Sequence, residues 1–272
     1  MANAMSSGGY SFAADDDPDL VREAAPFALK AQESLLAQDP GHRGLLASLC
    51  RGFTQYASAF VWQDAVEQSD AERAAAGKER ANRLFLRAKE YGMRGLEAAH
   101  PGFGERLAAD PASAVAMAGE EDVPLLFWTA ASWSLAISTS GGVPTLLADL
   151  PRCESLMRRA LALREDYEHG SIHEYFVAFE GGRPGPMGGS LDKARRHFER
   201  AMELGRGRKI SPLVTFAETV SVRTQNREEF LGLLSRALAF DAREEAPEFR
   251  LANLLSQRKA KWLVGRVDEL FL

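Results

Sequence analysis

Helical periodicity runs through the whole chain, and it constrains the possible fold more than any other feature. Near the start of the chain, four apolar residues fall on one stripe with polar residues between them: Leu20, Phe27, Leu35 and Leu36. Spacing close to 3.6 residues predicts an amphipathic helix. Convincing strand-like alternation of apolar and polar residues is not found in the sequence. The sequence therefore predicts an all-α protein.

Helix-start signals and breaks divide this pattern into separate helices. Asp17–Pro18 and Asp110–Pro111 each offer an N-cap followed by proline at the first helical position. Asn226, with Glu229 three residues later, is typical of a capping pair. Glycine and proline cluster between the expected helices, around 39–41, 100–102, 141–142 and 181–189. These signals predict many helices joined by short turns.

A spacing of small and large side chains recurs along the chain. It resembles Ala-x-x-x-Phe-x-x-Ala, which is typical of the second helix of a tetratricopeptide repeat, where small and large residues interlock with the next unit. Three segments share the spacing, and their residues are Ala194, Phe198 and Ala201; Phe230, Leu234 and Ala237; and Cys153, Met157 and Ala160. We therefore expect stacked antiparallel helix pairs, with an ordinary helical bundle as the alternative.

Residues 123–138 (VPLLFWTAASWSLAIS) contain no charged side chain. The run has 16 residues, fewer than the ~20 that a membrane-crossing helix needs. It predicts a helix buried on nearly all sides, at an oligomer seam or around a cavity.

Composition limits the class of protein. With 272 residues, 46% of them hydrophobic, the chain can form one large core, and we expect a single helical domain over 15–272. The formal net charge of −5 argues against nucleic-acid binding, which needs a basic face. Residues 1–14 lack the charged and apolar regions of a signal peptide, so we expect a disordered N-terminal segment or a cloning remnant.

Motifs for catalysis or metal binding are weak. His169 and His173 are four residues apart, but Gly170 lies between them and the HExxH pattern of zinc hydrolases is absent. A hydrogen-bonded His173 is the preferred interpretation. The glycine-rich segment 181–190 lacks the ending of a phosphate-binding loop and is expected to be a connector. We predict no enzyme activity, no metal and no cofactor, and we expect Cys50 and Cys153 to be buried free thiols.

Seven residues are candidates for a ligand site. Aromatic residues at helical spacing fill a core or line a cavity with a few polar groups. The expected cavity-lining aromatic residues are Phe53, Tyr56, Trp128 and Trp133. Three polar residues lie in otherwise apolar helical segments and are expected to orient a ligand or to form hydrogen bonds in the core: Glu218, Asn253 and Gln257.

An ordered series of segments resembles one known family. The series comprises 15–42, 51–61, 83–103, 123–140 (VPLLFWTAASWSLAISTS), 160–204, 211–222 and 250–271. Together these segments are similar to the T component associated with TRAP (tripartite ATP-independent periplasmic) transporters. The resemblance covers about 15–271, and it rests on the order of the segments rather than on any single motif.

The resemblance implies a periplasmic lipoprotein of tetratricopeptide-like repeats, anchored through a lipid-modified N-terminal cysteine. No cysteine lies near the start of this sequence, which fits a chain cut after the lipobox. The family implies a role beside the solute-binding subunit of the transporter and contact with a small organic-acid or hydrophobic solute. It also suits a homo-oligomer, for which a trimer is favoured. The family offers no agreed catalytic residues.

Three functional hypotheses remain at this point. The first is an accessory protein that docks the solute-binding subunit and handles its solute. The second is a general tetratricopeptide scaffold that binds a protein or peptide in its concave groove. The third is a metal-dependent enzyme built on His169 and His173, which would require a third ligand and an open coordination position. The uncharged segment and the aromatic stripe favour the first.

Overall fold

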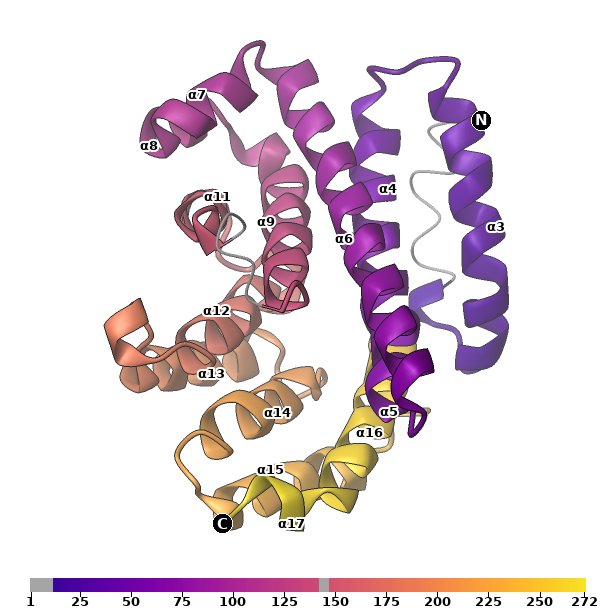
Figure 1. Cartoon of the computed structure of the whole chain (residues 1–272), viewed down its shortest axis with the longest axis vertical. Coiled ribbons are helices and arrows are strands. Elements are labelled where there is room, and N and C mark those ends of the chain that lie inside the picture. The colour runs from indigo at the N-terminus through magenta and orange to yellow at the C-terminus, as the bar shows by residue number, and fades with distance from the viewer. Residues whose placement is uncertain (1–11, 142–146) are drawn as a thin grey trace. The chain divides into compact units, whose positions relative to one another are not determined.

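The computed structural model describes residues 12–141 and 147–272 (Figure 1). Within these two ranges every regular element is a helix and no strand occurs. The predicted all-α class is therefore confirmed, whereas the tetratricopeptide repeat stays a prediction. Residues 1–11 of the expected N-terminal segment, and residue 142 of one expected break, lie outside the described residues.

The chain divides into two compact units. The described part of unit 1 comprises residues 19–141 and 147–164, and that of unit 2 comprises residues 12–18 and 165–272. The expectation of one domain over 15–272 stays a prediction.

Unit 1 contains long helices joined by short turns. Its elements are α3 (Pro18–Leu36), α4 (Arg43–Tyr56), a π-helix (Ala57–Trp62), α5 (Gln63–Glu67), α6 (Ala71–Ala99), α7 (Phe103–Ala109), α8 (Pro111–Ala116), a short 3₁₀ helix (Glu120–Asp122), α9 (Val123–Ser138) and α11 (Leu150–Leu163). Helix α3 begins at Pro18, as predicted, and buries Val21, Leu29 and Leu36. Leu20 and Phe27 of the predicted stripe are instead 56% and 80% exposed.

Helix α9 is the uncharged segment, and its bounds are those predicted from the sequence. It packs against α4, α6 and α11, so neighbouring helices cover most of its surface (Figure 1). Leu126, Ala130 and Ala136 are fully buried. Cys50 and Cys153, which lie on α4 and α11, are also fully buried and are free thiols, as predicted. The absence of charge along 123–138 therefore reflects burial inside unit 1.

Side-chain caps fix where several helices begin. Asp110 accepts hydrogen bonds from the backbone N–H groups of the first turn of α8, and Asn226 accepts one from Glu229 N at 3.0 Å, which confirms both predicted caps. The long helix α6 begins after Asp70, whose carboxylate accepts from the backbone N–H of Arg73 at 2.9 Å. A capped start is worth about 1 kcal/mol.

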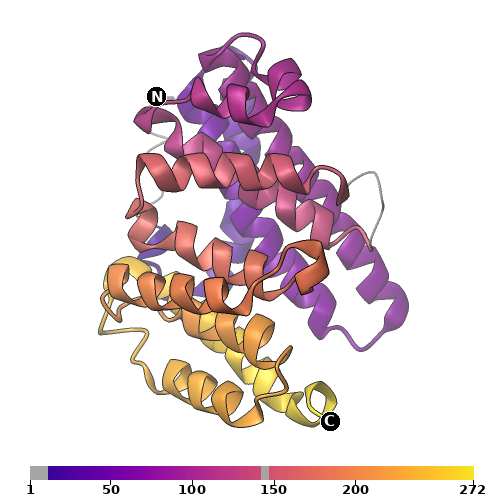
Figure 2. The same cartoon turned by 90° about the vertical axis from the view of Figure 1, so that its left-hand side faces the viewer.

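Unit 2 is built from shorter helices. Its elements are a 3₁₀ turn (Tyr167–His169), α12 (Ser171–Gly181), a 3₁₀ turn (Gly185–Met187), α13 (Leu191–Leu204), α14 (Ser211–Phe216), a π-helix (Ala217–Ser221), α15 (Arg227–Ala239), a 3₁₀ turn (Pro247–Phe249), α16 (Arg250–Gly265) and α17 (Val267–Leu270). Helices α12 and α13 lie side by side (Figure 2). The core gathers Phe216, Phe230 and Leu234, all at most 1% exposed.

Candidate functional site

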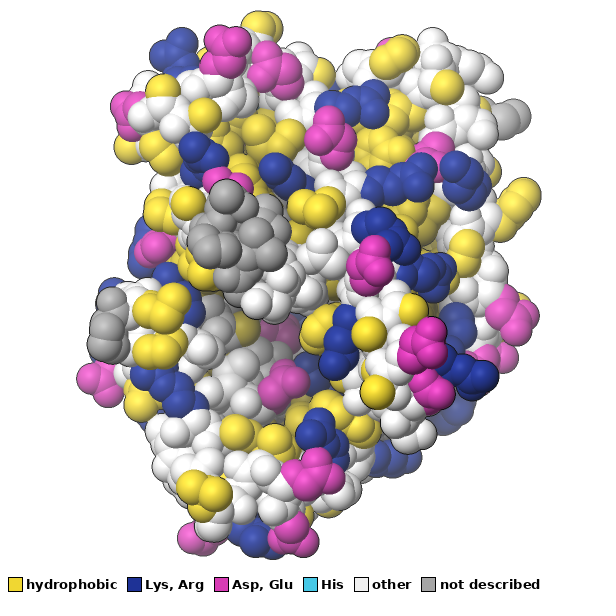
Figure 3. All heavy atoms as spheres, viewed as in Figure 1, with side chains coloured by type: hydrophobic (Ala, Val, Ile, Leu, Met, Phe, Trp, Pro, Cys, Tyr) yellow, Lys and Arg dark blue, Asp and Glu magenta, His cyan; other side chains and the backbone are white. Residues whose placement is uncertain are grey.

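Helix α6 carries four arginines at intervals of seven residues: Arg73, Arg80, Arg87 and Arg94. Seven residues are nearly two helical turns, so the positions drift by only about 20° per interval and share one face. Arg73, Arg80 and Arg87 are exposed, and Arg94 is half-buried. We call these four residues the arginine stripe. Lys and Arg side chains gather over α6 and the neighbouring α3, with hydrophobic side chains between them (Figure 3).

Aromatic rings lie beneath three members of the stripe. Measured from the guanidinium carbon to the ring centroid, the pairs are Arg80 with Tyr56 at 5.9 Å, Arg87 with Phe53 at 4.9 Å, and Arg94 with Tyr91 at 5.6 Å. The rings of Phe53 and Tyr91 stack with centroids 5.8 Å apart. A cation over an aromatic face within about 6 Å is attracted by the ring quadrupole. Helix α4, which packs along α6, supplies Phe53 and Tyr56.

A single carboxylate from α3 meets the middle of the stripe. The Tyr91 hydroxyl donates to Glu33 Oε1 at 2.5 Å, Arg87 forms an ion pair with the same oxygen, and Lys30 Nζ lies 2.6 Å from Oε2. Burial alone would raise the pKa of Glu33, but the hydrogen bonds from Lys30 and Tyr91 and the charge of Arg87 hold that pKa below its ordinary value. The Glu33 carboxylate is therefore ionised, and its contacts link α3 to α6.

The other three arginines have no such partner. Across residues 12–141 and 147–272, no carboxylate forms an ion pair with Arg73, Arg80 or Arg94. Arg80 contacts the Tyr56 hydroxyl at 3.4 Å, and Arg94 donates to the Pro40 carbonyl at 3.1 Å. A guanidinium has five N–H donors. Most of the donors of these side chains therefore remain available to an anion from outside.

A small pocket lies at the Arg94 end of the stripe. Its volume is about 200 Å³, and it is lined by Glu33, Leu36, Ala37, Pro40, Tyr91 and Arg94. None of the seven residues predicted from the sequence is among these lining residues. The pocket combines apolar side chains with one guanidinium that lacks a carboxylate partner in the described chain. Its small size suits one end of a ligand rather than a whole cofactor.

The two predicted tryptophans lie on α9. Trp128 is 8% exposed, meets Phe127 edge-on with centroids 4.9 Å apart, and has the guanidinium of Arg51 5.7 Å from its ring centroid. Trp133 is 4% exposed, and Lys89 Nζ lies 4.0 Å from its ring centroid. Among the described residues the buried indole N–H of Trp133 finds no hydrogen-bond partner. Both rings thus pack within unit 1 beneath cations.

The three predicted polar residues belong to unit 2 and hold helices together. Glu218 forms an ion pair with Lys259 at 2.6 Å. Asn253 is fully buried, accepts from the Ile210 backbone N–H at 3.1 Å and donates to a backbone carbonyl at 2.9 Å. Gln257 donates to two carbonyls at the end of α15, at 3.1 and 2.7 Å. These contacts use polar groups of all three side chains that a ligand would otherwise meet.

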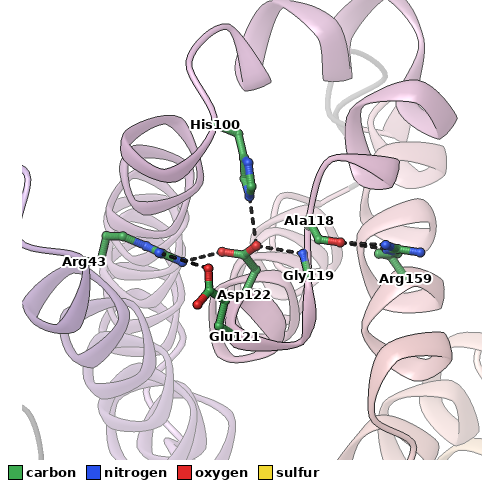
Figure 4. A network of polar contacts seen from close by, with 7 residues as sticks. All are labelled: Arg43, His100, Ala118, Gly119, Glu121, Asp122 and Arg159. Atoms are coloured by element: carbon green, nitrogen blue, oxygen red, sulfur yellow. Dashed lines mark hydrogen bonds and ion pairs between the residues drawn. The ribbon is translucent and has the colours of Figure 1, made fainter.

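A buried carboxylate organises the start of α9 (Figure 4). Asp122 is 1% exposed; its oxygens meet the guanidinium of Arg43, His100 Nε2 at 2.8 Å and the Gly119 N–H at 2.9 Å. Glu121 also lies near Arg43, at 3.7 Å, but is 78% exposed. The network joins the start of α4, the residue after α6 and the loop before α9. The Asp122 carboxylate is thus engaged by all three of these partners.

Two histidines of unit 2, His173 and His197, belong to a hydrogen-bonded group. His173 Nε2 lies 3.1 Å from Glu165 Oε1, and His173 Nδ1 lies 2.8 Å from His197 Nδ1. The predicted hydrogen-bonded His173 is therefore confirmed. His169 instead meets the ring of Phe249 edge-on, with centroids 5.0 Å apart. No group of three or more potential metal ligands occurs within the described ranges.

Comparison with known protein families matches residues 14–271 to the family described as TRAP transporter T-component. The chain belongs to this family. A protein of Treponema pallidum (strain Nichols), described as uncharacterized, is 30% identical over 267 residues, which cover 96% of this chain and 82% of that protein. The resemblance found in the sequence is thereby confirmed. The T-component is an accessory part of a TRAP transporter.

Phe53 and Tyr56 are predicted from the sequence to line an apolar cavity, and that role stays a prediction for this T-component. The structure places both rings beneath arginines of α6, which the sequence analysis does not single out. The seven-residue interval of these arginines is visible in the sequence. Their position over aromatic rings is not, because most of those rings belong to another helix. Among the described residues of the T-component, no helix combines the length and the apolar character needed to span a bilayer.

Proposed function

We propose that this T-component docks the solute-binding subunit of a TRAP transporter and helps to bind or relay a small organic-acid or hydrophobic solute. It performs no catalysis in this role. It works in the periplasm, held at a membrane by a lipid anchor on its full-length precursor, and forms a homo-oligomer for which a trimer is favoured. Family membership supports the transporter setting.

The pocket at Arg94 is the observation that carries the solute-handling part. An organic acid has a carboxylate and an apolar remainder. The Arg94 guanidinium offers charge-assisted hydrogen bonds to the carboxylate, while Leu36 and Ala37 face the remainder. Lys30 and Arg87 neutralise Glu33 in the pocket wall, so its charge does not repel the anion.

Phe53 and Tyr56 are the two sequence-predicted site residues closest in role to this proposal. They support Arg87 and Arg80, and so shape the face that continues from the pocket. Contacts of the other five predicted site residues with a solute also stay proposals: Trp128, Trp133, Glu218, Asn253 and Gln257. Each of these side chains already has neighbours within its own unit.

Light scattering behind size exclusion tests the docking role. The T-component, the solute-binding subunit from the same organism and their mixture are run separately, each with and without candidate organic acids. A co-eluting complex of fixed stoichiometry is the expected result, and the T-component alone reports its oligomeric state. No complex at concentrations of roughly tens of micromolar would favour the general scaffold instead.

Calorimetric titration with organic acids tests the pocket itself. Arg94→Gln removes the charge and leaves a shorter, neutral polar side chain, so it is expected to weaken binding by about tenfold, as for one lost charge-assisted hydrogen bond. Arg236→Gln, an exposed position on α15 of unit 2, is the matched control. Equal affinities of the Arg94→Gln variant and the unmodified protein would contradict binding at this pocket.

A further inference from the structure

The arginine stripe is too long for the solute that the pocket suits. Each seven-residue interval rises about 10 Å along the helix, so Arg80 and Arg94 are about 21 Å apart along its axis, and Arg73 extends the row to about 31 Å. A small organic acid at Arg94 reaches at most the next interval. A ligand that contacts the outer arginines as well must therefore be larger and extended along the helix.

The rings beneath the stripe prepare its arginines for such a partner. A guanidinium held within about 6 Å of an aromatic ring centroid has already lost part of its rotamer freedom. Arg80 over Tyr56 and Arg94 over Tyr91 are held in this way, with no carboxylate partner in the described chain. An anion that binds them consequently costs less side-chain entropy than at a free arginine.

The charge of α6 contrasts with that of the whole chain. The helix has seven Lys and Arg residues against four Glu residues, hence a net charge of +3, whereas the chain carries −5. A local positive row on an acidic protein attracts acidic partners and repels basic ones. The positive charge of α6 thus favours a partner with negative charge, and the seven-residue interval indicates how far apart those negative charges lie.

We propose that the arginine stripe is a docking surface for a partner protein, which presents Asp or Glu side chains at seven-residue intervals along one helix face. Carboxylates on such a helix repeat every ~10 Å, as the arginines do. A helix laid along α6 then brings its carboxylates into register with Arg73, Arg80 and Arg94, whereas Arg87 is already paired with Glu33. The inference rests on the proposed docking function and names the surface and the chemistry through which docking occurs.

A helical peptide with Glu at every seventh position is the probe. Its binding to the full-length T-component is followed by fluorescence anisotropy between about 0.1 and about 1 M salt, a range over which the Debye length falls from about 10 Å to about 3 Å. The expected result is binding that weakens steeply with salt. A peptide of the same composition with the Glu residues scattered around the helix is expected to bind at least about tenfold more weakly.

Charge reversal locates the surface. The variant with Arg73→Glu, Arg80→Glu and Arg94→Glu is expected to lose peptide binding by about tenfold or more. A control with the same change in net charge reverses three exposed cations of unit 2, Lys193, Arg196 and Arg236, and is expected to bind as the unmodified protein does. Circular dichroism of each variant, together with the milder Arg80→Gln and Arg94→Gln pair, separates lost binding from lost folding.

The same variants are then mixed with the solute-binding subunit. A complex that forms with the unmodified protein and the control but not with the stripe variant supports the inference. A complex that the stripe variant forms equally well overturns it and leaves the docking function standing. If even the unmodified protein forms no complex, the docking function fails. Peptide binding unaffected by charge reversal, or binding of anionic vesicles but not of the peptide, would also overturn the inference.

Discussion

Gly92 lies where α6 meets both α4 and α9. A Cβ at this position would overlap Thr129 Oγ1 and lie 2.9 Å from Cys50 Sγ, and both of those residues are buried. Thr129 is β-branched and cannot easily turn away. Gly92→Ala is therefore expected to lower the free energy of unfolding by about 1–3 kcal/mol through overpacking. Urea denaturation followed by circular dichroism measures this change.

Gly232 on α15 is the matched control for that substitution. It is exposed, and a Cβ there meets nothing within 4 Å. Gly232→Ala is expected to raise the free energy of unfolding by about 0.5–1 kcal/mol, because alanine restricts the unfolded chain and favours the helix. The essential result is that the two substitutions change the free energy of unfolding in opposite directions. A stabilising Gly92→Ala would show that the three helices do not meet as closely as described.

Asp122 and its neighbour Glu121 provide a second comparison at the scale of single residues. Loss of the buried Asp122 carboxylate removes the partner of His100 and of the Gly119 N–H, and it leaves Arg43 with only the exposed Glu121. Asp122→Ala is expected to cost about 2–4 kcal/mol, less than a fully buried pair because Arg43 can regain water. Glu121→Ala is expected to change stability by less than about 0.5 kcal/mol. Similar costs for both substitutions would show that the contacts of Asp122 with Arg43, His100 and Gly119 do not stabilise the fold.

At the scale of elements, α12 and α13 are joined by the hydrogen bond between His173 on α12 and His197 on α13. Burial lowers the pKa of His173 below its ordinary value of 6.5, although the charge and hydrogen bond of Glu165 act in the opposite direction. Glu165 is itself held ionised, since the hydrogen bond from Arg200 lowers its pKa to about 2. His197 completes the group from α13. The folded state therefore favours neutral His173 beside an ionised Glu165.

This arrangement makes stability depend on pH in a definite direction. Below pH 6.5 the unfolded state binds a proton at His173 more readily than the folded state does, so stability present above that pH is lost as pH falls. The loss is at most about 1.4 kcal/mol per pH unit. Denaturation at pH 7, 6 and 5 is expected to show a shallower fall for His173→Gln than for the unmodified protein.

Glu165 contributes little to the comparison, because the stability from its lowered pKa is nearly complete above the ordinary value of 4.5 and is lost as pH falls from there toward about 2. Identical slopes for the two proteins would mean that His173 titrates alike in the folded and unfolded states, contrary to its burial.

At the scale of the whole molecule, two buried thiols report on the opening of unit 1. Cys50 and Cys153 are fully buried, and burial raises the pKa of each thiol to about 12. Because the thiolate is the reactive form, we expect neither to react with a thiol reagent until unit 1 opens. Reaction at pH 8 should therefore be slow for both thiols and should accelerate with urea. The denatured chain should react at once with two equivalents of the reagent. Rapid reaction of one thiol in the native protein would contradict this burial.

The pattern of helices follows directly from the sequence, because helix formation depends on neighbours three and four residues apart. The 16-residue run without charge identifies α9, with the same bounds, and its burial follows from the absence of any polar face. The caps at Asp110 and Asn226, the buried thiols and the family could likewise be read from the residues alone.

Contacts between helices could not be read in this way. Asp122 meets Arg43 across 79 positions, and Tyr91 meets Glu33 across 58, distances at which no local period pairs one residue with another. Leu20 and Phe27 show the same limit, since their spacing predicted the helix but not which face would be covered. The sequence by itself determined which segments are helices and to which family they belong. Only the tertiary structure decided that three arginines of α6 lie over aromatic rings, because packing of α4 against α6 brings two of those rings beneath them.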